Sequence, residues 1–267
     1  MNPDEFEALM RAGEAYHGLK VEPDKWIVLR VDGRGFSKFT LDQEFDKPFD
    51  PRFRDLMLAT TAQLLEDVGG VYAFVESDEI SVLLPKDTDF FKRSIEKLVS
   101  ISAASATATF SIAAGTPVHF DSRIWVGDTL DDVVAYFSWR QADARRCCLN
   151  GWIYWTLRKQ GLSKRTATSL LRQVKPQDRV KMLERRGIRW DSLPDWQKNG
   201  LAFSYRDVAR NAVNPMTGAK VVAHRRELIL HDELDDGDDY RAMVSEIAWR
   251  STWGAREKKR QRKKALT

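Results

Sequence analysis

Residues 71–84 read VYAFVESDEISVLL. Two apolar runs, 71–75 and 80–84, flank the polar tetrapeptide Glu76-Ser77-Asp78-Glu79. Short apolar runs joined by a polar turn predict a β-hairpin. This hairpin would carry two neighbouring carboxylates, Asp78 and Glu79, at its tip.

The segments on either side of this hairpin have their own signals. Residues 25–31, KWIVLRV, form a short apolar run that predicts a buried strand ending just before Asp32. Asp50-Pro51 has an N-cap residue followed by proline at the first helical position, and Gly69-Gly70 would end that helix. We expect a second helix from about Phe90 and a further strand near 110–114.

The expected order is therefore β-α-β-β-α-β, which defines an α+β fold with a ferredoxin-like sheet, as in the palm of nucleotide polymerases. In this pattern two helices cover one face of a four-stranded sheet, and the other face stays open for a ligand. Residues 129–161 have helical periodicity, and further helices are expected at 163–172 and 176–186. A strand at 227–230 and a final helix would follow, so the C-terminal part is expected to be mainly helical.

These elements suggest four regions. Residues 1–128 would form the palm-like catalytic region, and 129–205 a helical basic region that completes the domain. Residues 206–254 would be a C-terminal extension. Residues 255–267 include AREKKRQRKK, a run of charged and polar residues with almost no apolar side chain, so we expect a disordered basic tail.

The distribution of charge separates two halves of the chain. Residues 1–138 carry 14 basic and 24 acidic side chains, whereas 139–198 carry 15 basic and 5 acidic ones. An acidic front half suits cations, and a basic middle suits a polyanion such as RNA.

Other features limit the class of protein. We find no apolar run of the roughly 20 residues that a membrane span needs, and the first ten residues are acidic, so we expect a cytoplasmic protein without a membrane partner. The only cysteines, Cys147 and Cys148, are adjacent, and the four histidines lack the spacing of zinc ligands. We interpret both thiols as structural.

Two acidic positions could carry chemistry. Asp32 directly follows the first strand, and Asp78 with Glu79 lies in the hairpin. Side by side in the sheet, they could hold two hard cations about 4 Å apart, the arrangement for in-line phosphoryl transfer. Asp-Gly and Ser-Asp are also common turn dipeptides, so the spacing alone allows a purely structural interpretation.

Weaker candidates surround these carboxylates. Gly33-x-Gly35 could bring backbone N–H groups close to phosphate, and Lys47, Arg93 and Lys97 could contact a triphosphate. Residues 139–161, WRQADARRCCLNGWIYWTLRKQG, interleave aromatic and basic side chains as RNA-binding segments do. We interpret the aromatic residues of GWIYWTL as a buried helix face, and the cations as candidate RNA-backbone contacts: Arg145, Arg146, Arg158 and Lys159.

Several separated motifs then agree. RVDGRGFSKF (30–39), KPFD (47–50), ESDEISVLL (76–84), FDSRI (120–124), SWRQAD (138–143) and KMLERRGIRWDSLP (181–194) occur in the order typical of one family. Over roughly residues 20–205 the chain resembles the tRNA-histidine guanylyltransferase-like (Thg1-like) family of 3′–5′ RNA polymerases.

The resemblance implies an enzyme, a nucleotidyltransferase whose two Mg²⁺ ions are bound by Asp32, the Gly33 carbonyl and Asp78, with Glu79 also catalytic. Its substrates would be ATP, GTP or other nucleoside triphosphates and a tRNA, and the assembly a homotetramer. The residues that we expect to bind the nucleotide are Arg30, Gly33, Arg34, Gly35, Phe36, Lys47, Asp50, Ser77, Arg93 and Lys97. Those expected to contact RNA are Arg123, Arg140, Asp143, Arg145, Arg146, Arg158 and Lys159.

The chain also departs from the family. Where eukaryotic-type members carry HINNLYN after WRQAD, residues 145–151 read RRCCLNG. That motif is associated with ATP-dependent activation of the 5′ end and with untemplated addition of guanosine. We therefore expect template-dependent addition to the 5′ end of truncated tRNA, with activation optional. The alternatives are a tRNA-histidine guanylyltransferase, a catalytically degenerate tRNA-binding protein and a nucleotide cyclase with the same palm.

Overall fold

The computed structural model describes residues 1–213 and 216–265, and the side chains of 223–224 and 253–265 lie outside the description. The strands are β1 (Trp26–Arg34), β2 (Tyr72–Glu76), β3 (Glu79–Leu83), β4 (His119–Gly127), β5 (Leu201–Val213) and β6 (Lys220–His231). The helices are α1 (Pro3–Ala12), α2 (Phe36–Asp42), α3 (Pro51–Asp67), α4 (Ile95–Ala114), α5 (Leu130–Lys159), α6 (Lys164–Gln173), α7 (Arg179–Glu184), α8 (Asp195–Lys198) and α9 (Gly237–Ala265). Short 3₁₀ turns occupy Phe90–Arg93, Pro176–Asp178 and Trp190–Ser192.

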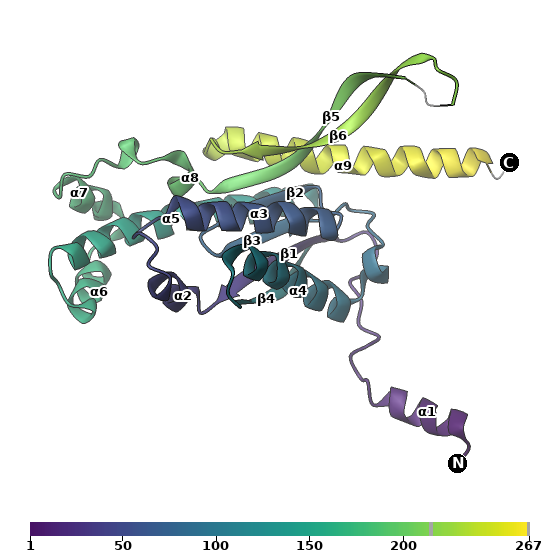
Figure 1. Ribbon diagram of the computed structural model, residues 1–267, viewed down its shortest axis with the longest axis horizontal. Coiled ribbons are helices and arrows are strands. Elements are labelled where there is room, and N and C mark those ends of the chain that lie inside the picture. Colours follow the sequence, from purple (N-terminus) through teal and green to yellow (C-terminus); the bar gives the residue numbers. More distant parts are fainter. Residues whose placement is uncertain (214–215, 266–267) are drawn as a thin grey trace.

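One antiparallel sheet organises the fold, with the strand order β4-β1-β3-β2-β5-β6. The first four of these strands, together with α3 and α4, follow the predicted β-α-β-β-α-β order, so the α+β palm-like fold is confirmed. α3 and α4 lie side by side on one face of the sheet (Figure 1). There Leu29 and Val31 of β1 pack with Leu64 of α3 and Phe110 of α4.

The start of α3 is as predicted. The Asp50 side chain accepts a hydrogen bond from the backbone N–H of Arg52, and Pro51 opens the helix. The hairpin prediction is also confirmed, since β2 and β3 pair across the Ser77-Asp78 turn.

The predicted strand at 110–114 is wrong, because α4 continues to Ala114 and the strand follows as β4. Alanine favours helix, and the Ser102 hydroxyl donates to the Leu98 carbonyl one turn earlier instead of breaking the helix. Gly115, with a φ of 66°, ends the helix in the left-handed conformation.

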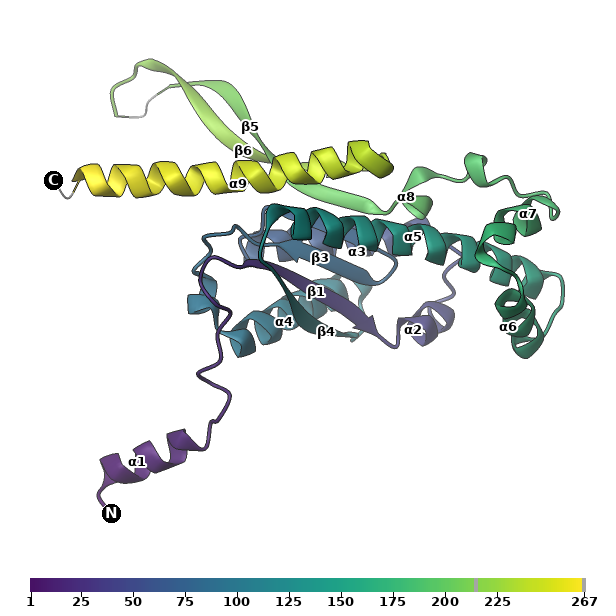
Figure 2. The same ribbon diagram turned by 180° about the vertical axis from the view of Figure 1, so that it is seen from behind.

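The second face of the sheet is not open as expected. α5 and α9 run across it (Figure 2). Val133 and Phe137 of α5 and Val244 of α9 pack on it, and the hydroxyls of Tyr72 and Tyr240 share a 3.0 Å hydrogen bond. The apolar alternation of the strands on this side needs such a cover. At one end of the sheet, the Asp32 side chain remains 40% exposed.

The C-terminal part is less helical than expected. β5 and β6 extend the sheet and continue as a long two-stranded hairpin beyond the body (Figure 1). The expected strand at 227–230 lies within β6, and the boundary expected at 205/206 falls inside β5. Residues 255–265, expected to be disordered, form the end of α9, because the arginine, lysine, glutamate and alanine of this stretch favour helix without needing a core. Residues 266–267 lie outside the described residues.

Within the described residues, α4 has the length and hydropathy of a membrane span. We had expected no apolar segment of that length. Leu98, Ala106 and Phe110 of this helix pack in the core between α3 and the sheet. Length and composition alone are weak grounds for a membrane span, because a core helix has the same properties.

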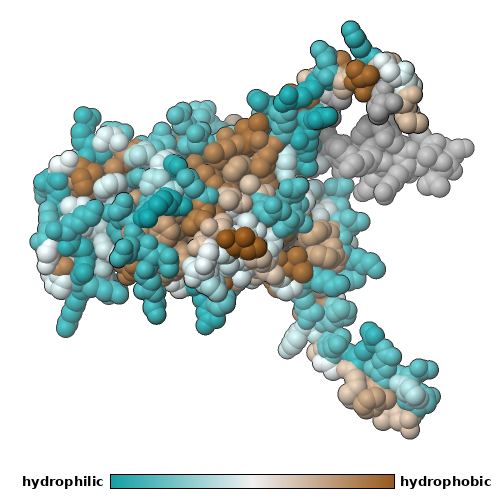
Figure 3. Space-filling view, in the orientation of Figure 1, coloured by the Kyte–Doolittle hydropathy of each residue, from teal (hydrophilic) through white to brown (hydrophobic). Residues whose placement is uncertain are grey.

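α1 stands apart from the body of the molecule (Figures 1 and 3). It is capped by Asn2 and has no buried residue. Phe6, Leu9 and Met10 are each more than half exposed.

Candidate active site

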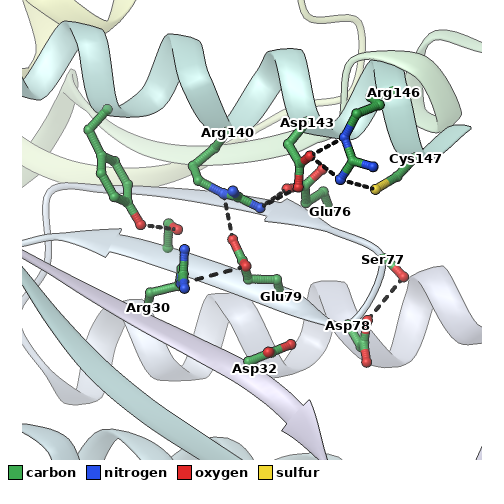
Figure 4. Close-up of polar contacts among 12 residues, drawn as sticks. Arg30, Asp32, Glu76, Ser77, Asp78, Glu79, Arg140, Asp143, Arg146 and Cys147 are labelled. Atoms are coloured by element: carbon green, nitrogen blue, oxygen red, sulfur yellow. Dashed lines mark hydrogen bonds and ion pairs between the residues drawn. The ribbon is translucent and has the colours of Figure 1, made fainter. Parts of the chain in front are cut away.

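Asp32, Asp78 and Glu79 meet at one end of the sheet. Asp32 of β1 lies opposite Glu79 of β3 in the antiparallel register. The backbone N–H of Gly33 donates a 3.0 Å hydrogen bond to the carbonyl oxygen of Asp78. Figure 4 shows the Asp32 side chain extending from β1 toward the turn that carries Asp78. Two carboxylates distant in the chain therefore share one end of the sheet.

Local backbone geometry fixes this arrangement. Ser77 has a φ of 49°, and its hydroxyl donates to the Asp78 carboxylate at 3.1 Å. A Cβ on Gly33 would lie 2.5 Å from the ring of Phe36, so only glycine fits there. Gly35, with a φ of 76°, then turns the chain into α2.

The charges at this end of the sheet repel one another. Burial raises the pKa of Asp78, and the neighbouring Asp32 charge raises it further. Burial also raises the pKa of Glu79, with a smaller contribution from Asp32, while Arg140 and Arg30 oppose the rise. A divalent cation between Asp32 and Asp78 would offset this repulsion.

The donor set fits Mg²⁺. Carboxylate and carbonyl oxygens are the ligands that this hard cation prefers, and it usually keeps several waters or substrate phosphates. Among the described residues, no group of three or more His, Cys, Asp or Glu side chains is arranged to hold a metal. Two aspartates with the Gly33 carbonyl would therefore bind the ion together with oxygens of the substrate.

Arg140 of α5 is buried among carboxylates. It forms ion pairs with Glu76, with Glu79 at 2.7 Å and with Asp143 at 3.1 Å (Figure 4). Burial raises the pKa of Glu76, and the Arg140 guanidinium that pairs with it opposes this rise. We expected Arg140 to contact RNA. With only 4% of it exposed, it lies below the surface that RNA could reach.

A cavity of about 540 Å³ opens beside the hairpin turn. Its polar side includes Lys47, Asp50, Ser77 and Asp78. Other lining residues come from the α2–α3 segment, α5 and α8, and include Phe36, Phe45, Phe49, Cys147, Tyr154, Trp155, Arg158 and Trp196. Groups that can bind phosphate and rings on which a base can stack therefore lie around one space.

Lys47 is held in the cavity wall. Its ammonium group donates to the Thr40 hydroxyl and lies 5.9 Å from the centre of the Trp155 ring. Burial lowers its pKa. The Lys159 ammonium donates to the Lys47 carbonyl oxygen at 2.9 Å, which ties this segment to α5.

Comparisons with known proteins identify the family of this chain. A family model described as "Thg1: tRNAHis guanylyltransferase" matches residues 7–135, and one described as "Thg1 C terminal domain" matches 131–265. The chain belongs to the Thg1 family.

Relatives support this membership. A tRNA(His) guanylyltransferase of Neurospora crassa is 32% identical over 67% of this chain and 66% of its own length. A probable tRNA(His) guanylyltransferase of Dictyostelium discoideum is 32% identical over 78% of this chain and 85% of its own length. The chain thus spans just under two thirds of the Neurospora relative. A bacterial tRNA(HIS) guanylyltransferase (Thg1)-like protein in complex with GTP shares the fold, with a TM-score of 0.68 at 23% identity over 92% of this chain and 99% of that one.

The stretch that departs from the family's HINNLYN motif lines the cavity only in part. Arg145 pairs with Asp236 at 2.5 Å, and both Cys147 and Cys148 line the cavity. Cys148 is buried, and both thiols are free. Burial raises the pKa of Cys147 to about 11, so this thiol is protonated at neutral pH, which fits a structural group.

Four of the side chains expected to contact the nucleotide do not line the cavity. Arg93 is buried and donates to backbone carbonyls, including that of Lys25 at 2.7 Å, so it holds loops together. Lys97 is exposed on α4, 5.8 Å from the centre of the Phe91 ring. Arg34 is exposed at the end of β1. Arg30 points toward the site but pairs with Glu79 at 3.6 Å.

The expected RNA contacts are divided. Arg123 pairs with Asp121 at 2.8 Å and lies 3.8 Å from Asp32, which places it at the exposed edge of the site. Asp143 holds both Arg140 and Arg146, so it acts within the protein. Three further cations also have partners within the protein. Arg145 forms an ion pair with Asp236, Arg158 donates to the Leu162 carbonyl, and Lys159 donates to the Lys47 carbonyl.

Sequence reasoning missed two aromatic side chains. Tyr154 and Trp155, which we expected on a buried helix face, are partly buried and also line the cavity. Together with Ala144 and Cys147, they fall on one stripe of α5 that lines the cavity. That stripe was visible in the sequence, but the cavity that it faces was not.

Proposed function

We propose that this chain is a Mg²⁺-dependent nucleotidyltransferase that adds nucleotides to the 5′ end of truncated tRNA by copying the opposite strand. The supporting observation is that Asp32 and Asp78 meet beside a cavity that also holds Lys47. The GTP bound to the bacterial protein of the same fold supports a nucleotide substrate.

The chain's own groups would position the reactants. Lys47 and Ser77 would hold phosphate oxygens, and Trp155 offers a ring on which a base can stack. Mg²⁺, when bound by Asp32, Asp78 and the Gly33 carbonyl, would polarise the phosphate and favour ionisation of the attacking hydroxyl. Arg123 at the exposed edge of the site would contact the RNA backbone.

The chemical form of the RNA 5′ end determines which bonds form and break. The 3′-hydroxyl of the incoming nucleotide attacks the 5′-terminal phosphorus of the RNA and loses its proton. If the RNA carries a 5′-triphosphate, pyrophosphate leaves. If it carries a monophosphate, prior transfer of AMP from ATP releases pyrophosphate, and AMP leaves in the second step. Positioning and charge neutralisation supply most of the rate.

Templated addition is favoured over untemplated guanosine addition because of residues 145–151. Arg145 is paired with Asp236, Cys148 is buried, and Cys147 presents a protonated thiol. This stretch therefore offers the cavity few of the polar groups that HINNLYN would supply.

The test is incubation with full-length tRNA and with a tRNA lacking its 5′ nucleotide, each with one labelled triphosphate at a time. We expect faster addition to the truncated tRNA, with the nucleotide complementary to the opposite strand. Guanosine addition to full-length tRNA-His regardless of the opposing base would instead favour a tRNA-histidine guanylyltransferase. Binding without incorporation would indicate a degenerate enzyme, and a cyclic product from triphosphate alone would indicate a cyclase.

We also propose a homo-oligomer, with the tetramer as the expected state. α1 is a ten-residue helix with no buried residue, and isolated helices of this length are marginal in water. A second copy would give its exposed Phe6, Leu9 and Met10 a surface to pack on. Light scattering on the full chain tests this, and a monomer at micromolar concentration would contradict it.

A further inference from the structure

Glu76 and Glu79 form a like-charged pair next to the hairpin turn. They are cross-strand partners, one at the end of β2 and the other at the start of β3. Side chains of such partners point to the same face of the sheet, and like charges placed opposite each other destabilise the pairing. Without a counter-charge, this pair would push apart the two strands that carry the turn at Asp78.

Arg140 supplies that counter-charge from the facing helix. Its guanidinium bridges Glu76 of β2 and Glu79 of β3, and it also pairs with Asp143. Trp139 covers the guanidinium, with its ring centre 4.4 Å from the Arg140 Cζ. The side chain thus fastens both strands of the hairpin to α5.

A second contact joins α5 and β3 at the matching position one helical turn away. The hydroxyl of Tyr136, one helical turn before Arg140, shares a 2.9 Å hydrogen bond with the Ser81 hydroxyl. Four helical residues rise about 6 Å, and two strand residues rise about 6.6 Å. The pairs Tyr136–Ser81 and Arg140–Glu79 are therefore successive links along the same two elements.

This clamp acts on the proposed cation site through the turn. Asp78 lies between the two clamped glutamates, and Glu79 lies opposite Asp32 in the register. Any splaying of β2 from β3 would shift Asp78 relative to Asp32. Groups that orient metal ligands typically change metal affinity by 10–100-fold when they are altered.

We propose that Arg140 is a positioning residue, which clamps Glu76 and Glu79 so that Asp78 is held at the distance from Asp32 that a divalent cation needs. This inference rests on the proposed function for its metal, but its first readout is metal binding without catalysis. It assigns to Arg140 a role inside the protein instead of the RNA contact expected from its sequence neighbourhood.

The test compares wild type with Arg140→Lys, which keeps the charge but loses the fork that spans two carboxylates. Mn²⁺ binding to the nucleotide-free full chain is measured by electron paramagnetic resonance. We expect about tenfold weaker Mn²⁺ binding. In the transfer assay kcat should fall, KM for the triphosphate should change less than twofold, and excess Mn²⁺ should restore much of the rate.

Arg93→Lys is the matched control, because Arg93 is also a buried arginine but bonds to backbone carbonyls away from the carboxylates. It should lower the melting temperature and leave Mn²⁺ affinity unchanged. A similar loss of Mn²⁺ affinity in this control would mean that any buried arginine has the effect, and would overturn the proposal.

A second variant guards against misfolding. Arg140→Gln combined with Glu76→Gln removes one positive and one negative charge together, and should also weaken Mn²⁺ binding. Wild-type Mn²⁺ affinity and kcat in either folded variant would contradict the proposal, and failure of both to fold would assign Arg140 to stability alone. An inactive wild type that still binds Mn²⁺ more tightly than Arg140→Lys would count against the proposed function but not against the clamp.

Discussion

The backbone N–H of Gly33 donates a 3.0 Å hydrogen bond to the carbonyl oxygen of Asp78. This single bond joins the end of β1 to the hairpin turn, two segments about 45 positions apart in the chain. It places the residue after Asp32 directly against Asp78. The candidate cation site depends on this junction.

Replacing Gly33 with alanine should disturb that junction. The added Cβ would lie 2.5 Å from the Phe36 ring, which is packed against Phe110 and Phe120 and has little room to move. Overpacking of this kind costs about 1–3 kcal/mol, so the melting temperature should fall by several degrees. Gly18→Ala, where nothing lies within 4 Å, is the control. Equal melting temperatures for both variants would contradict the crowding argument.

Asp50 should stabilise the protein in a pH-dependent manner. Hydrogen bonds from Arg52, together with backbone N–H groups of Asp46 and Arg52, hold the pKa of Asp50 at about 2, below its ordinary value of 3.8. Because the folded-state pKa is depressed, the contribution is complete above the unfolded value and is lost as the pH falls toward about 2. We expect Asp50→Ala to cost about 1–2 kcal/mol at pH 7.

The measurement is urea unfolding of wild type and Asp50→Ala between pH 7 and pH 2.5. The difference in the free energy of unfolding should be constant from pH 7 to about pH 5 and then shrink. A difference that stays constant down to pH 2.5 would show that the charge of Asp50 does not contribute.

Lys47 and Trp155 should control nucleotide affinity. Lys47→Met removes the ammonium group that lies over the Trp155 ring in the described cavity wall. The KM for the triphosphate should therefore rise about tenfold, which is equivalent to about 1.4 kcal/mol. Trp155→Ala should also raise KM, whereas Trp155→Phe keeps a stacking surface. Lys38→Met, an exposed lysine on α2, serves as the control and should leave KM unchanged.

RNA binding should depend on exposed cations more than on paired ones. Arg165 and Arg172 are exposed on α6, whereas Arg145 is already paired with Asp236. The double variant Arg165→Gln/Arg172→Gln should lower the slope of log affinity against log salt concentration by about 2, one for each phosphate that the protein no longer neutralises. Arg145→Gln should leave the slope unchanged. The reverse pattern in tRNA binding titrations would place the interface on α5 instead.

Local signals in the sequence were sufficient for much of the palm. The Asp50-Pro51 cap and the apolar runs around Ser77-Asp78 depend on neighbours within a few residues, and both features are found where predicted. The end of α4 was harder, because small residues such as Ala104 and Ala108 carry no clear apolar periodicity. Helix propensity and the Gly115 cap decide that boundary.

Long-range packing could not be predicted from the sequence pattern. Tyr240, Val244 and Ala248 form an apolar stripe at four-residue spacing, but the stripe does not say which surface it covers. Its return to the sheet closed the face that we expected to be open. In the same way, the SWRQAD motif drew attention to Arg140. The three carboxylates that pair with Arg140 could be identified only in the folded chain.

The most direct test of the proposed mechanism is a 5′-extension assay on truncated tRNA with labelled triphosphate and Mg²⁺, comparing wild type with Asp32→Ala and Asp78→Ala. Circular dichroism and melting curves first establish that both variants fold. We predict incorporation by wild type and loss of incorporation in each variant. Near-wild-type incorporation by either folded variant would contradict the claim that these two aspartates together hold the catalytic cation.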